Sequence, residues 1–250
     1  MDATDANIYL FDAVSNGSLR GVEAALKAGA DIDCKYARCE DSRPATLLFH
    51  ASCMGDVDTA RLLLCKGASL VKRSDRSAFA PLHAAAINGK TEVVDLLVQH
   101  GATVDIRDGF QNTPLMRACN YNHVDTVRRL IELGARPDLT GGQLQGMRYY
   151  KPGTEIGKGE NEESLKLVEE ARKSKLLRCC NPTCGKPGYR STGTLKLCGR
   201  CKLTRYCSRD CQKQHWSVGH KKCCGHDAYN HDEADPLQQR MADKSHMKHS

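Results

Sequence analysis

The chain has 250 residues, 40% of them hydrophobic, with 14 cysteines and a formal net charge of +7. This composition allows a real core, and two modest domains fit it better than one because the cysteines are unevenly spread. The N-terminal stretch "MDATDANIYLFDAV" is acidic and has no long apolar run, so we expect neither a signal peptide nor a membrane span. We therefore expect a reducing compartment, the cytoplasm, the nucleus or both, where clustered cysteines more often bind metals than form disulfides.

Two series of turn-forming residues recur along the first half of the chain with the same spacing. In both series the steps are 38, 34 and 33 residues, and such agreement is hard to obtain by chance. Glycine adopts a left-handed backbone conformation without steric cost, and asparagine is the next most tolerant residue, so each marker is suited to end a helix. The first series is Gly29, Gly67, Gly101 and Gly134, and the second is Gly17, Gly55, Gly89 and Asn122.

Short amphipathic helices are predicted between these markers. The segments "EVVDLLVQ" (92–99) and "VDTVRRLIEL" (124–133) carry apolar residues at helical spacing. Upstream of them, "APLHAA" (80–85) and "TPLMRA" (113–118) place a proline at the first helical position, where its missing N–H costs nothing. Small residues recur in register and allow helices to approach closely, at Ala13, Ala51, Ala85 and Ala118.

These features resemble the ankyrin repeat, a turn and two antiparallel helices of about 33 residues with the signature T-P-L-H-x-A. The resemblance covers about residues 5–139 of a predicted domain at 1–139, and the four repeats lie at about 5–37, 43–75, 77–109 and 110–139. The first two repeats lack the proline, and such degenerate repeats are typical of polar caps.

An ankyrin solenoid implies a concave wall of turn tips and first helices that binds other proteins. His83 occupies the signature position and is expected to hydrogen-bond to neighbouring turns. The scattered cysteines are expected to be small buried hydrophobes at Cys53, Cys65 and Cys119 and exposed thiols at Cys34 and Cys39.

A connector is predicted over residues 140–178. Its first half is rich in glycine and proline and is expected to be a loop. The segment "NEESLKLVEEARKSKLL" (161–177) is acidic at its start and basic at its end, which predicts a helix that caps the repeats or serves as a spacer. At the other end of the chain, residues 225–250 are low in apolar residues and are expected to be disordered.

Nine of the 14 cysteines lie between 179 and 224, together with candidate histidines. Eight Cys and His ligands make two tetrahedral zinc sites, and zinc binding supplies the folding free energy that so small a segment cannot obtain from a core. The spacing within each ligand pair predicts a tight turn or a helical segment, and in either one the two ligands can face the same metal. The four pairs are Cys179 or Cys180 with Cys184, Cys198 with Cys201, Cys207 with Cys211, and His220 with Cys223 or Cys224.

The segment "RYCSRDCQKQHWSVGHKKCC" and the opening "CCNPTCGK" resemble the MYND-type zinc finger over residues 179–224. The resemblance favours Cys179 over Cys180 and Cys224 over Cys223, and His215 is a weaker rival of His220. The fold class is thus mostly α, an ankyrin-repeat solenoid of helix pairs and turns followed by a small zinc-stabilised finger. The family's interleaved topology implies one structural zinc on Cys179, Cys184, Cys207 and Cys211, and a second on Cys198, Cys201, His220 and Cys224.

The predicted function is a non-enzymatic adaptor or scaffold for protein partners. With four protein ligands on each zinc, no coordination position is open for catalysis, and a lone C-x2-C is weak evidence for redox chemistry. After Cys224 only 26 residues follow, so we expect no methyltransferase domain in this chain. MYND fingers bind short proline- and leucine-containing peptides partly by strand addition, and the matching groove residues here are Gln212 and Trp216, beside the edge strand "TGTLKL" (192–197).

Two other functions remain open. Ten lysines and arginines against one aspartate give residues 179–224 a formal charge of +9, so a transcription-linked regulator could contact DNA or chromatin complexes through the finger. Seven thiolates and two zinc ions would reduce this charge to about +6, and stacking aromatics are few, so nucleic acid is the less favoured partner. An accessory subunit of a methyltransferase complex is the third hypothesis.

Overall fold

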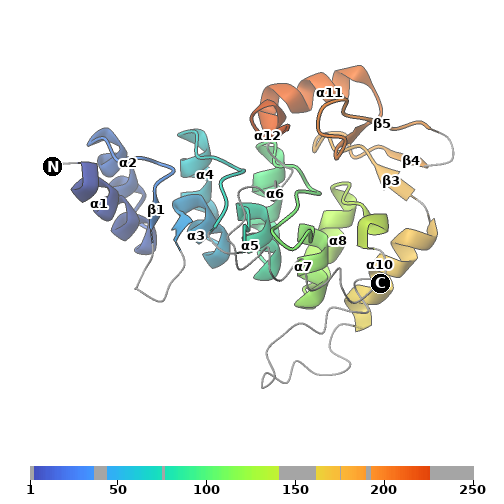
Figure 1. Ribbon diagram of the computed structural model, residues 1–250, viewed down its shortest axis with the longest axis horizontal. Coiled ribbons are helices and arrows are strands. Elements are labelled where there is room, and N and C mark those ends of the chain that lie inside the picture. The colour runs from blue at the N-terminus through green and yellow to red at the C-terminus, as the bar shows by residue number, and fades with distance from the viewer. Residues whose placement is uncertain are drawn as a thin grey trace, which may run out of the picture.

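The computed structural model describes residues 3–36, 44–74, 77–140, 162–174, 176–189 and 193–225. Four helix pairs follow one another along the chain and form a row in Figure 1. Each first helix packs on the first helix of the next pair, and each second helix packs on the next second helix. The pairs are α1 (Ala3–Ser15) with α2 (Leu19–Lys27), α3 (Leu47–Met54) with α4 (Val57–Cys65), α5 (Pro81–Ile87) with α6 (Thr91–Gln99), and α7 (Pro114–Asn120) with α8 (Val124–Glu132). This row is a solenoid.

The turn residues have the conformation that their spacing predicts. All eight markers have a positive φ, between +53° at Asn122 and +100° at Gly101. At each first-series glycine, the residue that follows donates its N–H to a carbonyl in the helix before it, as when Ala102 donates to Leu97. This reversal ends the second helix of every pair and directs the chain to the next repeat.

The core of the row is aliphatic and runs through all four pairs without interruption. The alanines in register, Ala13, Ala51, Ala85 and Ala118, are buried between helices. Cys119 is buried as expected, but the expectation was wrong for Cys65, which is exposed, and Cys53 is only partly buried. The buried face of α4 ends at Leu64, so Cys65, one residue further on, lies on the solvent side.

The second pair is preceded by a short ladder between β1 (Lys35–Tyr36) and β2 (Ala45–Thr46). Cys34 lies at its start and packs partly against the core, so it is not the exposed thiol that we expected. Cys39 lies outside the described residues. The first pair is not a wholly polar cap either, because three apolar side chains are exposed on it: Ile8, Tyr9 and Leu19.

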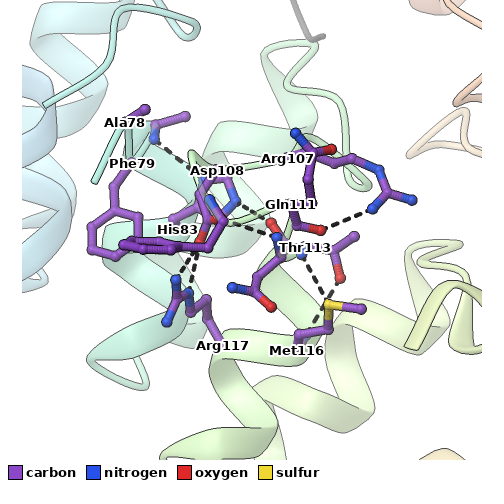
Figure 2. Close-up of polar contacts among 12 residues, drawn as sticks. Ala78, Phe79, His83, Arg107, Asp108, Gln111, Thr113, Met116 and Arg117 are labelled. Carbon is purple, nitrogen blue, oxygen red and sulfur yellow. Dashed lines mark hydrogen bonds and ion pairs between the residues drawn. The ribbon is translucent and has the colours of Figure 1, made fainter. Parts of the chain in front are cut away.

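Polar side chains connect the turn tips of the third and fourth repeats (Figure 2). The Asp108 carboxylate accepts hydrogen bonds from the backbone N–H groups of Phe110 and Asn112, and it forms an ion pair of 2.6 Å with Arg117. The Arg117 guanidinium lies 4.8 Å from the ring centre of Phe79. This network holds the tips of two adjacent repeats in one arrangement.

His83 has the structural role predicted for it. Its Nδ1 accepts from the backbone N–H of Ala80, at 3.2 Å, so its Nε2 carries the proton and donates to the carbonyl of Asn112, at 3.0 Å. Burial lowers the pKa of His83 to about 4, so the ring is neutral.

A further helix covers the C-terminal end of the row. After the short 3-10 helix η1 (Pro137–Thr140), α10 (Glu162–Ser174) packs against α8, with Val168 buried. The Ser164 hydroxyl donates to the Asn122 side chain at 2.8 Å. The helix ends before Leu176, short of the expected boundary at 177, because the next residues pair as a strand. The expected loop began at residue 140, which instead ends η1. The rest of that loop, residue 161 and the tail after 225 lie outside the described residues.

The last part of the chain has short elements. Two ladders form, β3 (Leu176–Arg178) with β4 (Pro187–Tyr189), and β5 (Lys196–Leu197) with β6 (Arg205–Tyr206). They are followed by α11 (Arg209–His215), the π-type turn η3 (Trp216–His220) and α12 (Lys221–Cys223). In Figure 1 this finger lies along the row beside α6 and α8. Within the described ranges, no helix is both long and apolar enough to cross a membrane.

Candidate metal centres

The first group of candidate ligands comes from two turns and one helix start. Cys179 follows β3, and Cys184 lies in a turn in which its N–H donates to the carbonyl of Asn181. Cys207 follows β6, and Cys211 lies in the first turn of α11, where Ser208 caps the helix by accepting from the Cys211 N–H at 3.1 Å. The ligand atoms of these four cysteines lie within 4.8 Å of one another.

The second group comes from one tight turn and the end of the finger. Cys198 and Cys201 lie in a turn closed by a hydrogen bond from the Lys202 N–H to the Cys198 carbonyl. His220 ends η3, and the Cys224 N–H donates to its carbonyl at 2.7 Å, which places both on one helical turn. The four ligand atoms again lie within 4.8 Å of one another. The two groups alternate along the chain, so each metal would connect distant segments.

The distances within both groups fit zinc. With Zn–S bonds of about 2.3 Å and Zn–N bonds of about 2.0–2.1 Å, tetrahedral ligands lie about 3.8 Å apart for two sulfurs and about 3.5 Å for sulfur and nitrogen. The observed Sγ–Sγ distances are 3.7 Å for Cys184–Cys207, 3.5 Å for Cys207–Cys211 and 3.7 Å for Cys198–Cys224. Cys201 Sγ lies 3.6 Å from His220 Nε2. Disulfides would need about 2.0 Å between sulfurs, so the donor set suits a metal and not a cross-link.

The two groups differ in exposure and electrostatics. In the first group Cys184 is exposed and Cys207 and Cys211 are partly exposed, whereas the second group is mostly buried. Partial desolvation opposes ionisation of Cys211, but hydrogen bonds from Ser208 and Asn181 outweigh it and lower its pKa to about 7. Thiolate is the form that binds zinc, so these neighbours favour the ligand state.

The rival ligands lie in neither group. Cys180 is buried, its Sγ accepts from the Arg205 N–H at 3.3 Å, and burial raises its pKa to about 12, so it is a neutral thiol. Cys223 is buried beside Cys224 without joining its group. His215 is also buried, and its Nδ1 lies 2.9 Å from the hydroxyl of Tyr206. Burial lowers the pKa of His215 to about 3, so it is neutral in the small core.

The candidate peptide residues lie on the same side of α11 and η3, four positions apart. Gln212 and Trp216 are both half-buried, and Trp216 packs against the small core that contains Tyr206 and Cys198. The predicted edge strand is shorter than 192–197, since only Lys196 and Leu197 pair with β6. Among the described strands, β5 has no second neighbour, and its Leu197 side chain is 46% exposed.

Sequence reasoning missed two threonines near the second group. The hydroxyl of Thr204 lies 3.5 Å from Cys201 Sγ and 3.4 Å from His220 Nε2. The hydroxyl of Thr103, in the ankyrin row, lies 3.5 Å from His220 Nδ1. A threonine without any cysteine or histidine beside it carries no metal-site pattern, so the sequence held no signal for Thr103.

Each of the known proteins that resemble this chain matches only part of it. It is 45% identical over 64 residues to human protein phosphatase 1 regulatory subunit 27, covering 26% of this chain and 42% of that protein. It is 36% identical over 90 residues to the E3 ubiquitin-protein ligase XB3 of Oryza sativa subsp. japonica, covering 35% of this chain and 20% of that protein. It is 31% identical over 137 residues to the transient receptor potential cation channel subfamily A member 1 of Drosophila melanogaster, covering 53% of this chain and 11% of that protein. The chain therefore spans less than half the length of these relatives.

Family models cover both parts. A model of ankyrin repeats in three copies matches residues 10–108 and 71–141, and a model of the MYND finger matches residues 169–224. Both kinds of domain generally bind other proteins and are typically non-enzymatic, and the clustered Cys and His residues support zinc binding. Since the ankyrin matches together span more than half of the chain, it belongs to the ankyrin-repeat family, and it carries a C-terminal MYND finger.

Proposed function

We propose that this protein is a non-enzymatic adaptor in which the ankyrin row binds one protein partner and the finger binds a short proline-containing peptide. The observation that carries the proposal is that each Cys/His group offers four protein donors at tetrahedral spacing. A zinc with four protein ligands has no position for a reacting water, so it stabilises a fold instead of performing chemistry.

The proposed metal content is two structural zinc ions. The first is bound by Cys179, Cys184, Cys207 and Cys211, and the second by Cys198, Cys201, His220 and Cys224. The distances of 3.5–3.7 Å between donor atoms support this assignment. We also propose that the protein lies in the cytoplasm, the nucleus or both, because these reducing compartments keep cysteine ligands from forming disulfides.

The peptide would bind at β5 as an added strand. Its backbone would pair with the open side of Lys196–Leu197, and its proline would contact Trp216, with Gln212 as a hydrogen-bonding side chain. The exposed Leu197 side chain and the half-buried Trp216 support this site, because an anchor side chain needs apolar area at the surface.

Fluorescence polarisation with a panel of labelled proline- and leucine-containing peptides tests the proposal on the full, zinc-loaded chain. We expect Gln212→Ala and Trp216→Ala to weaken binding at least about tenfold, which corresponds to about 1.4 kcal/mol. Lys213→Ala is the matched control, since Lys213 is exposed on the same helix and should leave binding unchanged.

The salt dependence separates the alternatives. Peptide binding through β5 should change little between low and moderate salt, whereas contact with DNA phosphates would weaken steeply. If duplex DNA binds with a steep salt slope and no peptide of the panel binds, the proposed peptide site is wrong and the transcription-linked alternative is favoured. The likeness to a ubiquitin ligase covers a fifth of that protein, so ubiquitin transfer forms no part of the proposal.

A further inference from the structure

The finger and the ankyrin row meet at a contact too close for side chains. It joins the turn after α6, at His100 and Gly101, to the end of η3, at Gly219 and His220. A Cβ atom on Gly101 would lie 2.5 Å from both the Gly219 carbonyl carbon and the His220 nitrogen, and a Cβ on Gly219 would overlap the His100 carbonyl oxygen. Only glycine at both positions allows this approach, so His220 is brought directly against the third repeat.

His220 uses its two ring nitrogens in different directions. The ring is fully buried, and Nε2 points to Cys201 Sγ at 3.6 Å while Nδ1 points to Thr103 Oγ1 at 3.5 Å. If Nε2 binds the metal, Nδ1 carries the proton and donates it to the threonine oxygen. Such a hydrogen bond selects the tautomer of a zinc-binding histidine and orients its ring.

In the first two repeats, the side chain at the position of Thr103 accepts hydrogen bonds from its own turn. Asp31 accepts from the N–H of Asp33, and Ser69 accepts from the N–H groups of Val71 and Lys72. Thr103, at the same position of the third repeat, contacts a side chain 117 residues away and is 1% exposed. The repeat architecture explains a polar residue at this position but not its contact with His220.

A second contact holds the finger on the next repeat. The Cys180 thiol lies 4.0 Å from the carbonyl of Gly134, and Asp105 and Arg205 are both buried in the same region. The pKa of Arg205 is lowered, chiefly by burial and then by the positive charge of Arg136. With contacts at both turns, the orientation of His220 relative to Thr103 is determined by the whole interface.

We infer that Thr103 is a positioning residue for the second metal site, so that the ankyrin row contributes to zinc binding by the finger. The inference rests on the proposed zinc assignment. It predicts that the finger is not an independent module: zinc affinity at the Cys3His site depends on a side chain of the third repeat.

Zinc release from the full chain to a chromogenic chelator tests this inference. Thr103→Val keeps the shape of the side chain and removes the hydrogen-bond acceptor. We expect it to lower the affinity for one of the two zinc ions by about 10–100-fold and to leave the affinity for the other unchanged. Thr103→Ser restores the hydroxyl and should restore affinity. Ser69→Ala is the matched control at the same position of the second repeat, away from the finger. With Co2+ in place of zinc, the absorption bands of the Cys3His site should change in Thr103→Val and not in Ser69→Ala.

Nitrogen-15 NMR of the wild-type histidines gives a readout that needs no variant: His220 should be protonated at Nδ1 and metal-bound at Nε2. Two zinc ions per chain with identical release from wild type and Thr103→Val would overturn the inference alone, and so would protonation at Nε2. Fewer than two zinc ions on the wild-type chain would overturn the proposed zinc assignment and this inference with it.

Discussion

The ankyrin row and the finger obtain their stability from different sources. The row buries a continuous series of leucines, valines and alanines from every helix pair. The buried cluster of the finger consists of Cys179, Cys198, Tyr206 and Cys224, and three of these four are proposed metal ligands. Apolar burial therefore stabilises the row, and we expect the finger to need metal in place of a core. Each region should respond to a perturbation that the other tolerates.

Removing zinc should produce the largest effect, and it should be confined to one region. Structural zinc contributes about 10–16 kcal/mol to the folding of small finger peptides, far more than the buried cluster of this finger can supply. We expect a strong chelator to abolish amide hydrogen-exchange protection in residues 176–225 and to leave α3 to α6 protected. Adding zinc back should restore it. Persistent protection of α11 in metal-free protein would contradict this division.

A cavity in the row should have the converse effect. Leu63 is fully buried in α4, away from the finger, and Leu63→Ala should lower the free energy of unfolding of the row by about 2–5 kcal/mol. Urea denaturation followed by circular dichroism measures this, with zinc content unchanged. Leu197→Ala is the control, because its side chain is 46% exposed and should matter little for stability. Similar losses for both variants would show that the two regions do not differ as described.

The sequence predicts the row well because its determinants are local. The glycines and Asn122 mark turns by their own backbone preference, and the prolines mark helix starts, so the period is visible without knowledge of contacts. Where the outcome depends on which side of a helix faces the core, the prediction is weaker. Cys65 shows this, since it directly follows Leu64, the last buried residue of α4.

The finger is predictable in its ligand spacing and unpredictable in its docking. Cys-x2-Cys and His-x3-Cys patterns carry the metal chemistry in the chain itself. The pairing of His220 with Thr103 spans 117 residues and depends on two glycines whose close approach exists only in the assembled fold. No local pattern encodes such a contact.

Acid should weaken the row through His83. Because burial lowers its pKa to about 4 in the folded state, the unfolded chain alone takes up a proton between about pH 6.5 and pH 4. The free energy of unfolding should therefore fall by up to about 3 kcal/mol across that window, and no further below it. Burial also lowers the pKa of His215, so the measure is the difference in slope between wild type and His83→Gln in urea denaturation. NMR should show a neutral His83 ring at pH 5. Equal slopes for the two proteins, or a charged ring at pH 5, would contradict the role assigned to this histidine.

The smallest expected effect is a gain in stability of the row. Gln111 has φ +63°, in the left-handed region, where a residue with a Cβ is less stable by about 1–2 kcal/mol than in the right-handed region. Its carbonyl accepts from Arg107, an interaction that does not need the glutamine side chain. Gln111→Gly removes the steric conflict but adds conformational freedom to the unfolded chain, so the net gain should be about 0.5–1 kcal/mol.

Gln111→Ala removes the same side chain and keeps the Cβ, so it should give no gain. Thermal unfolding of zinc-loaded protein distinguishes the two, and because the turn belongs to the row, the zinc affinity of the finger should be the same in both variants. A gain in Gln111→Ala equal to that in Gln111→Gly would mean that the side chain, and not the backbone conformation, limits stability at this turn.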